Sequence, residues 1–313
     1  MKNHLLIKGS FLLALIGLAA LPGLLRLIGL EESTIRSLLG SLTIIMIWGI
    51  FALSYNLLYG ITGLLSLGHS VFLGLGALGV GIAAIHWGMG FWPALVIGLL
   101  ISGLAAFLAG GLFSKIKRDA FWVATAVSSL MAYLLVLYFH DFTGGASGLR
   151  LPRDVLDLGM NDLSFIDRDV QYLFVLVVLV LVYSLLRWLA RTPLGMALSL
   201  IRENEEKAAL IGYSTQNLKW AAFGISGALA GLAGVLLAFA LHSMDADLFQ
   251  WTHSVQALAW VVIGGSGSLV GSLLGTGLAK GFEELWSNAW LSAPLLLGIL
   301  LILIARFTPR GSP

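Results

Sequence analysis

Ser66 and His69 are spaced so that they could act as a nucleophile and a general base in a hydrolase. Such a pair needs a carboxylate that orients the histidine, and many serine hydrolases carry the nucleophile in a G-x-S-x-G turn. The neighbouring apolar segments hold no such carboxylate, and the chain contains no G-x-S-x-G motif. We therefore expect no catalytic residues, although hydrolytic activity of the isolated chain would support a membrane-embedded hydrolase.

Glu283 and Glu284 are the carboxylates that an ion-coupled secondary transporter could use, but they lie at the end of an apolar segment. The glycine-rich stretch Val261–Gly275 could be taken for a phosphate loop. It lacks the Lys-Ser/Thr of a Walker A motif, and no Walker B partner is present. The sequence therefore predicts that this chain does not hydrolyse ATP by itself. An ATP requirement would separate an ATP-driven transporter from an ion-coupled one.

Polar residues punctuate a glycine-rich apolar stretch between positions 56 and 77. They are Asn56, Thr62, Ser66, His69 and Ser70. Non-helical backbone is tolerated at membrane depth only where protein or a water-filled cavity surrounds it. The pattern therefore predicts a broken helix whose polar side chains line a solute path. The alternative is tight helix packing, with the hydroxyl groups bonded to their own helix.

Three other patterns are interpreted as structural. Gly227 and Gly231 form a small-xxx-small face within residues 224–234, which predicts close helix packing. The pattern His242-x-x-Asp245-x-Asp247 superficially resembles a metal cluster but fits a solvated polar turn at a helix end. His69 has no second histidine or carboxylate at ligand spacing, so no metal site is expected there either.

One compact charged segment, residues 192–218, lies between two apolar stretches that are each long enough to cross a bilayer. Seven charged residues fall between Arg191 and Lys219, although charged residues make up only 11% of the protein. The spacing of the apolar residues predicts a short amphipathic helix that Gly212 would end. The alternative is a solvated connector stabilised by charge pairs such as Glu203 with Lys207. A polar element in an otherwise apolar chain is suited to docking a soluble protein.

The composition indicates an integral membrane protein. Hydrophobic residues make up 58% of the 313 positions, glycine occurs 38 times and cysteine is absent, whereas soluble proteins are less apolar and far more charged. The missing cysteines exclude disulfides and thiolate chemistry. We predict an all-α polytopic protein with a single transmembrane domain over residues 1–313, about ten apolar helices and glycine-rich breaks. The expected helices cover residues 8–30, 38–59, 69–88, 91–113, 120–139, 170–190, 219–241, 253–264, 268–284 and 289–306.

Two of these assignments carry an alternative. The first segment resembles a signal peptide, but no clear A-x-A site follows it, so we interpret it as a retained helix. The segments at 253–264 and 268–284 could be two short helices that meet within the membrane at Gly264–Ser268.

The distribution of basic residues predicts that both termini are cytoplasmic. Cytoplasmic loops concentrate Lys and Arg. Placing the amino terminus inside puts twelve basic residues on the cytoplasmic side and five outside, with Lys280 left in a membrane segment. Residues 140–169 then form the largest external loop, and residues 192–218 form the largest cytoplasmic one.

The segment at residues 54–72, SYNLLYGITGLLSLGHSVF, closely resembles the early signature of branched-chain amino-acid-type ABC importer permeases. Later segments follow in the order expected for that family: TPLGMA at 192–197, IRENEEKAALIG at 201–212, FGISGALAGLAG at 223–234, VIGGSGSLVGSLLG at 262–275 and FTPRG at 307–311. The resemblance covers roughly residues 43–311. It is nearest to the "M" type of the two paired permeases, whose charged external loop is longer.

The resemblance implies a set of partners. Such permeases pair with a homologous second permease, two cytoplasmic ATPase subunits that bind ATP and Mg²⁺, and an external solute-binding protein. This chain would hold no cofactor itself and would lie in a bacterial-type cytoplasmic (inner) membrane. The resemblance also implies a coupling helix that inserts into a cleft on an ATPase subunit. Its residues would be Ile201, Arg202, Glu203, Asn204, Glu205, Glu206, Lys207, Ala208, Ala209 and Gly212.

The solute implied by the resemblance is a branched-chain or other hydrophobic amino acid. Members of the family also carry urea, short amides and aromatic or other carboxylic acids, which remain alternatives. Closure of the ATPase pair would move the coupling helix and the helices attached to it, and so alternate access to a central path.

Overall fold

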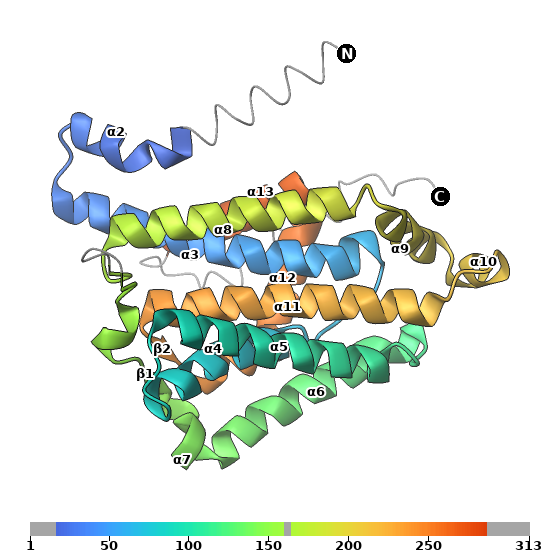
Figure 1. Ribbon diagram of the computed structural model, residues 1–313. Helices are drawn as coiled ribbons and strands as arrows, with labels where there is room; N and C mark the ends of the chain where they lie inside the picture. Colours follow the sequence, from blue (N-terminus) through green and yellow to red (C-terminus); the bar gives the residue numbers. More distant parts are fainter. Residues whose placement is uncertain (1–16, 160–163, 287–313) are drawn as a thin grey trace, which may run out of the picture.

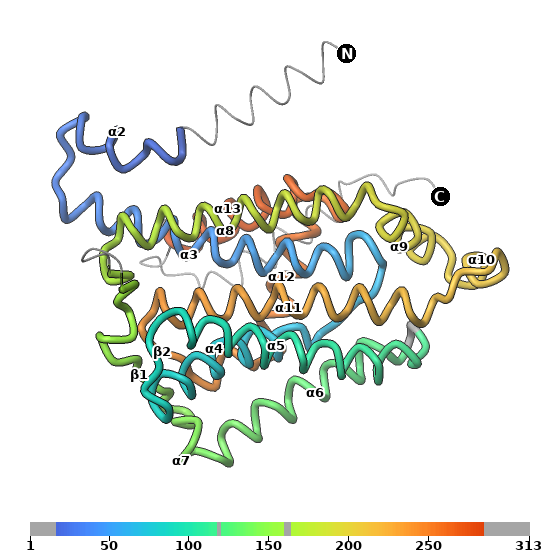
Figure 2. Tube along the Cα trace, viewed as in Figure 1, coloured from blue at the N-terminus to red at the C-terminus, as the bar shows by residue number. Residues whose placement is uncertain are grey.

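The computed structural model describes residues 17–159 and 164–286 of the chain. Within these ranges the long helices form a bundle in which most of them run along a common direction (Figures 1 and 2). Five are long and apolar enough to span a membrane, namely α3 with its continuation η1, α5, α6, α8 and α11. The predicted all-α membrane fold is confirmed.

The bundle is built from helices of very unequal length. Their bounds are α2 (Leu21–Leu27), α3 (Glu32–Asn56), the π-helical turn η1 (Leu57–Ile61), α4 (Ser70–Ile85), α5 (Phe91–Phe113), α6 (Arg118–Tyr138), α8 (Arg168–Leu189), α9 (Pro193–Glu203), α10 (Glu205–Leu210), α11 (Thr215–Leu241), α12 (Trp251–Gly264) and α13 (Leu269–Trp286). Short elements occupy the connections: α7 (His140–Thr143), η2 (Gly145–Ser147), β1 (Leu149–Arg150), η3 (Arg153–Leu156), β2 (Ser243–Met244) and η4 (Ala246–Phe249). Strands β1 and β2 pair antiparallel, with Leu149 opposite Met244.

Helix α11 packs closely against α4 and α5 because glycine lines its contact face. A Cβ atom at Gly231 would overlap the side chain of Ser102 on α5, and one at Gly234 would overlap the carbonyl oxygen of Leu73 on α4. Small residues let helix backbones approach in this way, which compensates for the lack of a strong hydrophobic drive between helices in lipid. The predicted packing role of residues 224–234 is therefore confirmed.

The first break separates α3 from α4. Helix α3 continues into η1, where the N–H of Thr62 donates to the carbonyl of Leu57 at 3.2 Å. Gly63 then adopts a φ of +76°, which ends the helix. Non-helical chain leads to Ser70, where α4 begins. With 16 residues, α4 is shorter than the roughly 20 needed to cross a bilayer. The predicted broken helix is present.

The second break separates α12 from α13, which are bent by 115°. Gly265 and Gly267 occupy the turn with φ values of +93° and +89°, a region that favours glycine. Gly264 and Gly271 face each other across the bend so closely that a Cβ on either would overlap the other's carbonyl. The interpretation as two short helices rather than two full spans fits this geometry.

The two ends of the bundle carry different elements. One end holds α2, α7, β1 and β2, and the other holds α9 and α10 (Figure 1). Arg26 of α2 lies at the first end and pairs with Asp169 at 2.6 Å and Glu32 at 2.9 Å. The loops that the sequence places on opposite sides of the membrane therefore lie at opposite ends of the molecule.

One expectation for the charged segment is wrong. A single short helix was expected there, but α9 and α10 are two helices separated at Asn204. The backbone of Asn204 is extended, and its side-chain oxygen accepts a hydrogen bond from the N–H of Lys207 at 2.9 Å. Asparagine at such a position starts a new helix rather than continuing the old one. Gly212, with a φ of +95°, follows the end of α10 as predicted.

The first and last predicted helices are not tested in full. The segment 8–30 is described only from residue 17, where α2 forms its later part. The segment 289–306 lies outside the described residues.

Candidate functional site

The five polar residues predicted to line a solute path all lie at the first break. Asn56 ends α3, Thr62 follows η1, Ser66 and His69 precede α4, and Ser70 is its first residue. All five are fully buried. The fold thus gathers them along the interruption between α3 and α4, inside the bundle. Their contact with a solute stays a prediction.

Their hydrogen bonds are of two kinds. The Thr62 hydroxyl donates back to the carbonyl of Leu57 at 3.0 Å, as the packing alternative expects. Others reach different elements. The Asn56 side-chain oxygen accepts a hydrogen bond from the N–H of Gly267 at 2.9 Å, and His69 Nε2 lies 2.9 Å from the hydroxyl of Ser54. Packing within one helix therefore does not account for the whole segment.

Among the five predicted path residues, three buried polar atoms lack a hydrogen-bond partner in the described part of the chain: Asn56 Nδ2, Ser66 Oγ and His69 Nδ1. Because the Ser54 hydroxyl donates to the carbonyl of Phe51 at 2.7 Å, it is left as an acceptor for Nε2–H of His69. Nδ1 of His69 is then an unprotonated acceptor. Buried polar groups are normally paired, so these unpaired donors and the unpaired acceptor are not explained by helix packing alone.

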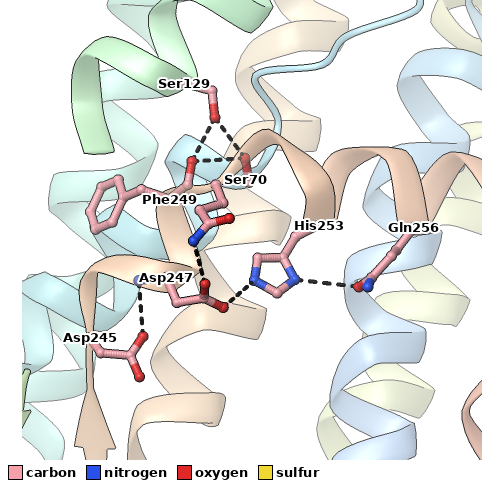
Figure 3. Close-up of polar contacts among 8 residues, drawn as sticks. Ser70, Ser129, Asp245, Asp247, Phe249, His253 and Gln256 are labelled. Carbon is pink, nitrogen blue, oxygen red and sulfur yellow. Dashed lines mark hydrogen bonds and ion pairs between the residues drawn. The ribbon is translucent and has the colours of Figure 1, made fainter. Parts of the chain in front are cut away.

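Ser70 starts α4 among hydroxyl groups from α6 and α12 and a backbone carbonyl from η4; Figure 3 shows its contacts with Ser129 and Phe249. Its N–H donates to Ser254 Oγ of α12 at 2.9 Å, and its own hydroxyl lies 3.1 Å from that of Ser129 on α6. The Ser129 hydroxyl also donates to the carbonyl of Phe249 at 2.6 Å. Ser129 and Ser254 were not predicted from the sequence, because isolated serines in apolar helices carry no local signal of what they contact.

The turn at 242–247 leads into the same region. Asp245 accepts a hydrogen bond from the N–H of Asp247 at 3.1 Å, and the Asp247 carboxylate pairs with His253 at 3.2 Å (Figure 3). The His253 ring stacks on Trp48 of α3 with ring centroids 5.3 Å apart. This turn therefore connects the end of α11 to the start of α12. In the described ranges, no three His, Asp or Glu side chains group as metal ligands.

The predicted coupling residues divide between a buried face and an exposed one. Ile201 on α9 and Ala208 on α10 pack into the protein, whereas Glu203, Glu206 and Lys207 are exposed. The exposed Ala209 lies beside a groove of about 590 Å³ that Glu203, Asn204, Glu205 and Glu206 also line. The exposed Gly212 follows α10. The arrangement provides a charged surface carried on two anchored helices.

An ion pair attaches α10 to the bundle. Lys219 Nζ on α11 lies 2.5 Å from the Glu205 carboxylate, and the Lys219 side chain is only 7% exposed. The expected pairing of Glu203 with Lys207 would need both on one helix, whereas they fall on either side of the Asn204 break. Glu205 therefore has a structural partner that the local charge pattern did not reveal.

Arg202 points back toward the two breaks. Its guanidinium donates to the carbonyl of Gly60 in η1 and, at 3.1 Å, to the hydroxyl of Ser266 between α12 and α13. The three segments meet beside a groove of about 330 Å³, which Gly60, Arg202 and Gly267 help to line. The charged segment is thus in direct contact with both broken helices.

Comparison with known proteins identifies the family. The model of the branched-chain amino acid transport system permease component matches residues 37–305. The chain belongs to this family. It is therefore a multi-pass ABC transporter permease, and the sequence-based resemblance is confirmed.

Individual relatives differ in the solute that their names state. The permease is 31% identical to the high-affinity branched-chain amino acid transport system permease protein LivM of Escherichia coli, over 86% of this chain and 68% of the relative. It is 25% identical to a probable branched-chain amino acid transport permease of Methanocaldococcus jannaschii, over 72% of this chain and 76% of the relative. It is also 25% identical to the autoinducer 2 import system permease protein LsrC of Yersinia pestis, over 85% of this chain and 73% of the relative. No solved structure matches the chain.

Proposed function

We propose that this permease is the membrane subunit of an ATP-driven importer for branched-chain or other hydrophobic amino acids. It would work with a homologous second permease, two cytoplasmic ATPase subunits that hold ATP and Mg²⁺, and an external solute-binding protein. The observation that carries the coupling role is the charged surface of α9 and α10. Both helices are anchored by buried residues such as Ile201 and Ala208 and leave Glu203 and Glu206 exposed.

Such a surface suits a mechanical contact. Because Lys219 ties α10 to α11 and Arg202 ties α9 to the breaks, a push on these helices would reach the rest of the bundle. A bundle of packed helices responds to such a push by rigid-body movement rather than by continuous deformation. With α9 and α10 in the cytoplasm, residues 140–169 and the β1–β2 pair would face outside, where the binding protein docks. Both termini would then be cytoplasmic, in a bacterial-type inner membrane.

The unused polar atoms at the first break support passage of an amino acid. Asn56 Nδ2 and the Ser66 hydroxyl can donate to a carboxylate, and His69 Nδ1 can accept a hydrogen bond from an ammonium group. Thr62 and Ser70 flank these groups in the same segment. The small number of such groups leaves most of the affinity to the solute-binding protein. Urea, amides, carboxylic acids and other polar solutes remain outcomes of the test described below.

Two experiments test the proposal. The tagged chain, purified in mild detergent, should bring down a second permease and ATPase subunits, which mass spectrometry would identify. Recovery of the chain alone would instead favour a self-contained transporter. The accompanying binding protein, screened by calorimetry against leucine, isoleucine, valine and phenylalanine and against urea, acetamide and benzoate, then identifies the solute class.

The docking surface is tested with charge reversals. Glu205 pairs with Lys219, so reversing its charge would also disturb the attachment of α10. Reversal of Glu203 and Glu206 alone is therefore more informative than reversal of Glu203, Glu205 and Glu206 together. The Glu203→Lys/Glu206→Lys variant should lose the ATPase subunits on purification while remaining folded in the membrane. Reversal of Asp154, on the opposite end of the bundle, is the matched control. Full recovery of coupled ATPase with the double variant would show that the coupling surface lies elsewhere.

The solute path is tested separately. Asn56→Ala, Ser66→Ala and His69→Ala should each lower the uptake rate in a reconstituted importer. Normal uptake by all three variants would show that the first break does not line the path.

A further inference from the structure

Arg202 differs from the other residues of the charged segment in the direction of its side chain. Arg202 is exposed, as are Glu203, Glu206 and Lys207, but its guanidinium donates to Gly60 and Ser266 in other elements. Gly60 is 142 residues and Ser266 is 64 residues away along the chain. One side chain therefore joins α9, η1 and the bend between α12 and α13.

The chemistry of the two acceptors suits a guanidinium. Gly60 lies in the last turn of the long helix formed by α3 and η1, where carbonyl groups have no donor within the helix and carry partial negative charge. The planar fork of arginine can donate to two acceptors at once, which the single ammonium of lysine cannot do with the same geometry. Arg202 thus binds a carbonyl at the carboxyl end of the α3–η1 helix and also binds the bend between α12 and α13.

The two breaks also touch without Arg202. Asn56 accepts a hydrogen bond from the N–H of Gly267, and a Cβ on Gly60 would lie 2.6 Å from that same nitrogen. A Cβ on Gly267, in turn, would lie 2.9 Å from Nη1 of Arg202. The backbones of both breaks and the guanidinium are therefore packed at the closest distance that glycine allows.

We propose that Arg202 is a positioning residue that latches the two broken helices together and ties both to α9. The inference rests on the proposed function, because it gives the proposed coupling segment a direct route to the path. When α9 moves, Gly60 and Ser266 must follow or release the guanidinium. In the structure described here the latch is closed, which agrees with the full burial of Thr62 and Ser66 just beyond it.

The absence of cysteine makes the latch measurable. In the Thr62→Cys variant, the single thiol replaces a fully buried hydroxyl next to η1. The full chain, reconstituted in nanodiscs so that both faces are accessible, is treated with a charged maleimide and the labelling rate is measured. Adding Arg202→Ala should raise this rate about tenfold, because hydrogen bonds to charged groups shift local opening by at least that factor. Adding Arg202→Lys should give an intermediate rate.

Matched controls separate the latch from general effects. Arg191 lines the same groove as Arg202, so Arg191→Ala removes a nearby charge, and it should leave the rate unchanged. Ser226→Cys places a thiol at a fully buried position on α11, and its labelling should not respond to Arg202→Ala. Equal acceleration of both reporters would show general loosening and overturn the latch. So would an unchanged rate for Thr62→Cys with Arg202→Ala.

The proposed role of Arg202 and the proposed importer function can be disproved separately. If ATPase subunits copurify with the chain, addition of ATP and Mg²⁺ should change the labelling rate of Thr62→Cys when Arg202 is present and have little effect when it is alanine. An ATP response that is equal in both backgrounds overturns the latch while leaving the importer intact. If no ATPase is recovered, the labelling experiment on the chain alone still decides whether Arg202 holds the breaks.

Discussion

The side-chain oxygen of Asn56 accepts a hydrogen bond of 2.9 Å from the backbone N–H of Gly267, although 211 positions separate the two residues. Both residues lie at interruptions of helices. Asn56 supplies its side-chain oxygen at the end of α3, and Gly267 supplies a backbone N–H in the bend between α12 and α13. The contact fixes the distance between α3 and the bend that joins α12 to α13.

Replacing Asn56 should therefore destabilise the protein. Asn56→Ala leaves the N–H of Gly267 without its acceptor and should lower the free energy of unfolding by about 1–3 kcal/mol. Thermal unfolding in detergent, followed by fluorescence-detected size exclusion, measures the effect. Ser199→Ala is the control, because Ser199 is exposed and its hydroxyl bonds only to its own helix. Equal melting temperatures for the two variants would contradict the prediction.

The glycine face of α11 should tolerate a methyl group at one position and not at another. At Gly234 the new Cβ overlaps the carbonyl oxygen of Leu73, whereas at Gly224 it would lie 3.9 Å from Phe107 Cα, an ordinary van der Waals contact. Gly234→Ala should cost roughly 1–3 kcal/mol through overpacking. Gly224→Ala should be neutral or stabilise by up to about 1 kcal/mol through helix propensity. The melting temperatures of the two variants test this prediction, and Gly234→Ala should have the lower one. A lower melting temperature for Gly224→Ala would contradict this account of the packing.

His242 should make the protein sensitive to acid. Partial burial, and secondarily the positive charge of Arg168, lower the pKa of His242 below its usual value of 6.5. The unfolded chain then binds more protons than the folded one, so stability should fall as the pH drops below about 6.5. Above that range this group should have no effect.

The His242→Asn variant tests the acid effect because asparagine tolerates the left-handed backbone, with φ of 56°, that His242 adopts. The difference in melting temperature between pH 7 and pH 5 should be smaller in the variant than in the parent. An identical pH dependence in the variant and the parent would exclude His242 as the cause.

The attachment of α10 should depend on its ion pair. Glu205→Ala leaves the nearly buried Lys219 without its carboxylate and should loosen α10 by about 1–3 kcal/mol, less than a fully buried pair because Glu205 is itself partly exposed. Limited proteolysis within residues 204–214 should then be faster. Glu206→Ala, an exposed neighbour, is the control. Restoration of slow cleavage by the exchanged pair, Glu205→Lys with Lys219→Glu, would confirm that the pair itself is responsible.

Local sequence patterns were sufficient to predict much of this molecule. The glycines and polar residues around Asn56 indicated a broken helix, because each of them disfavours or competes with regular structure in an apolar setting. The charged residues after Thr192 indicated a polar element between spans. Asn204 followed by two glutamates is a helix start signal, and it explains why two helices form where one was expected.

Contacts between distant segments could not be predicted in the same way. Arg202 and Gly60 meet only because α9 folds back onto the end of the first broken helix, and Ser70 meets Ser254 only because α12 starts beside α4. Neither pair has a local spacing that marks it. The sequence could therefore name the residues of the first break, but not what most of them touch.

The shortness of α4 has a consequence for biosynthesis. Its 16 residues extend about 24 Å, less than the hydrocarbon thickness of roughly 30 Å. The N–H at its start is bonded to Ser254, 184 residues later in the chain. Because exposed backbone groups are costly in lipid, a nascent chain that has not yet produced α12 must shelter the start of α4 in another way. We therefore expect the start of α4 to reach its final hydrogen bond only after the chain has been synthesised through Ser254.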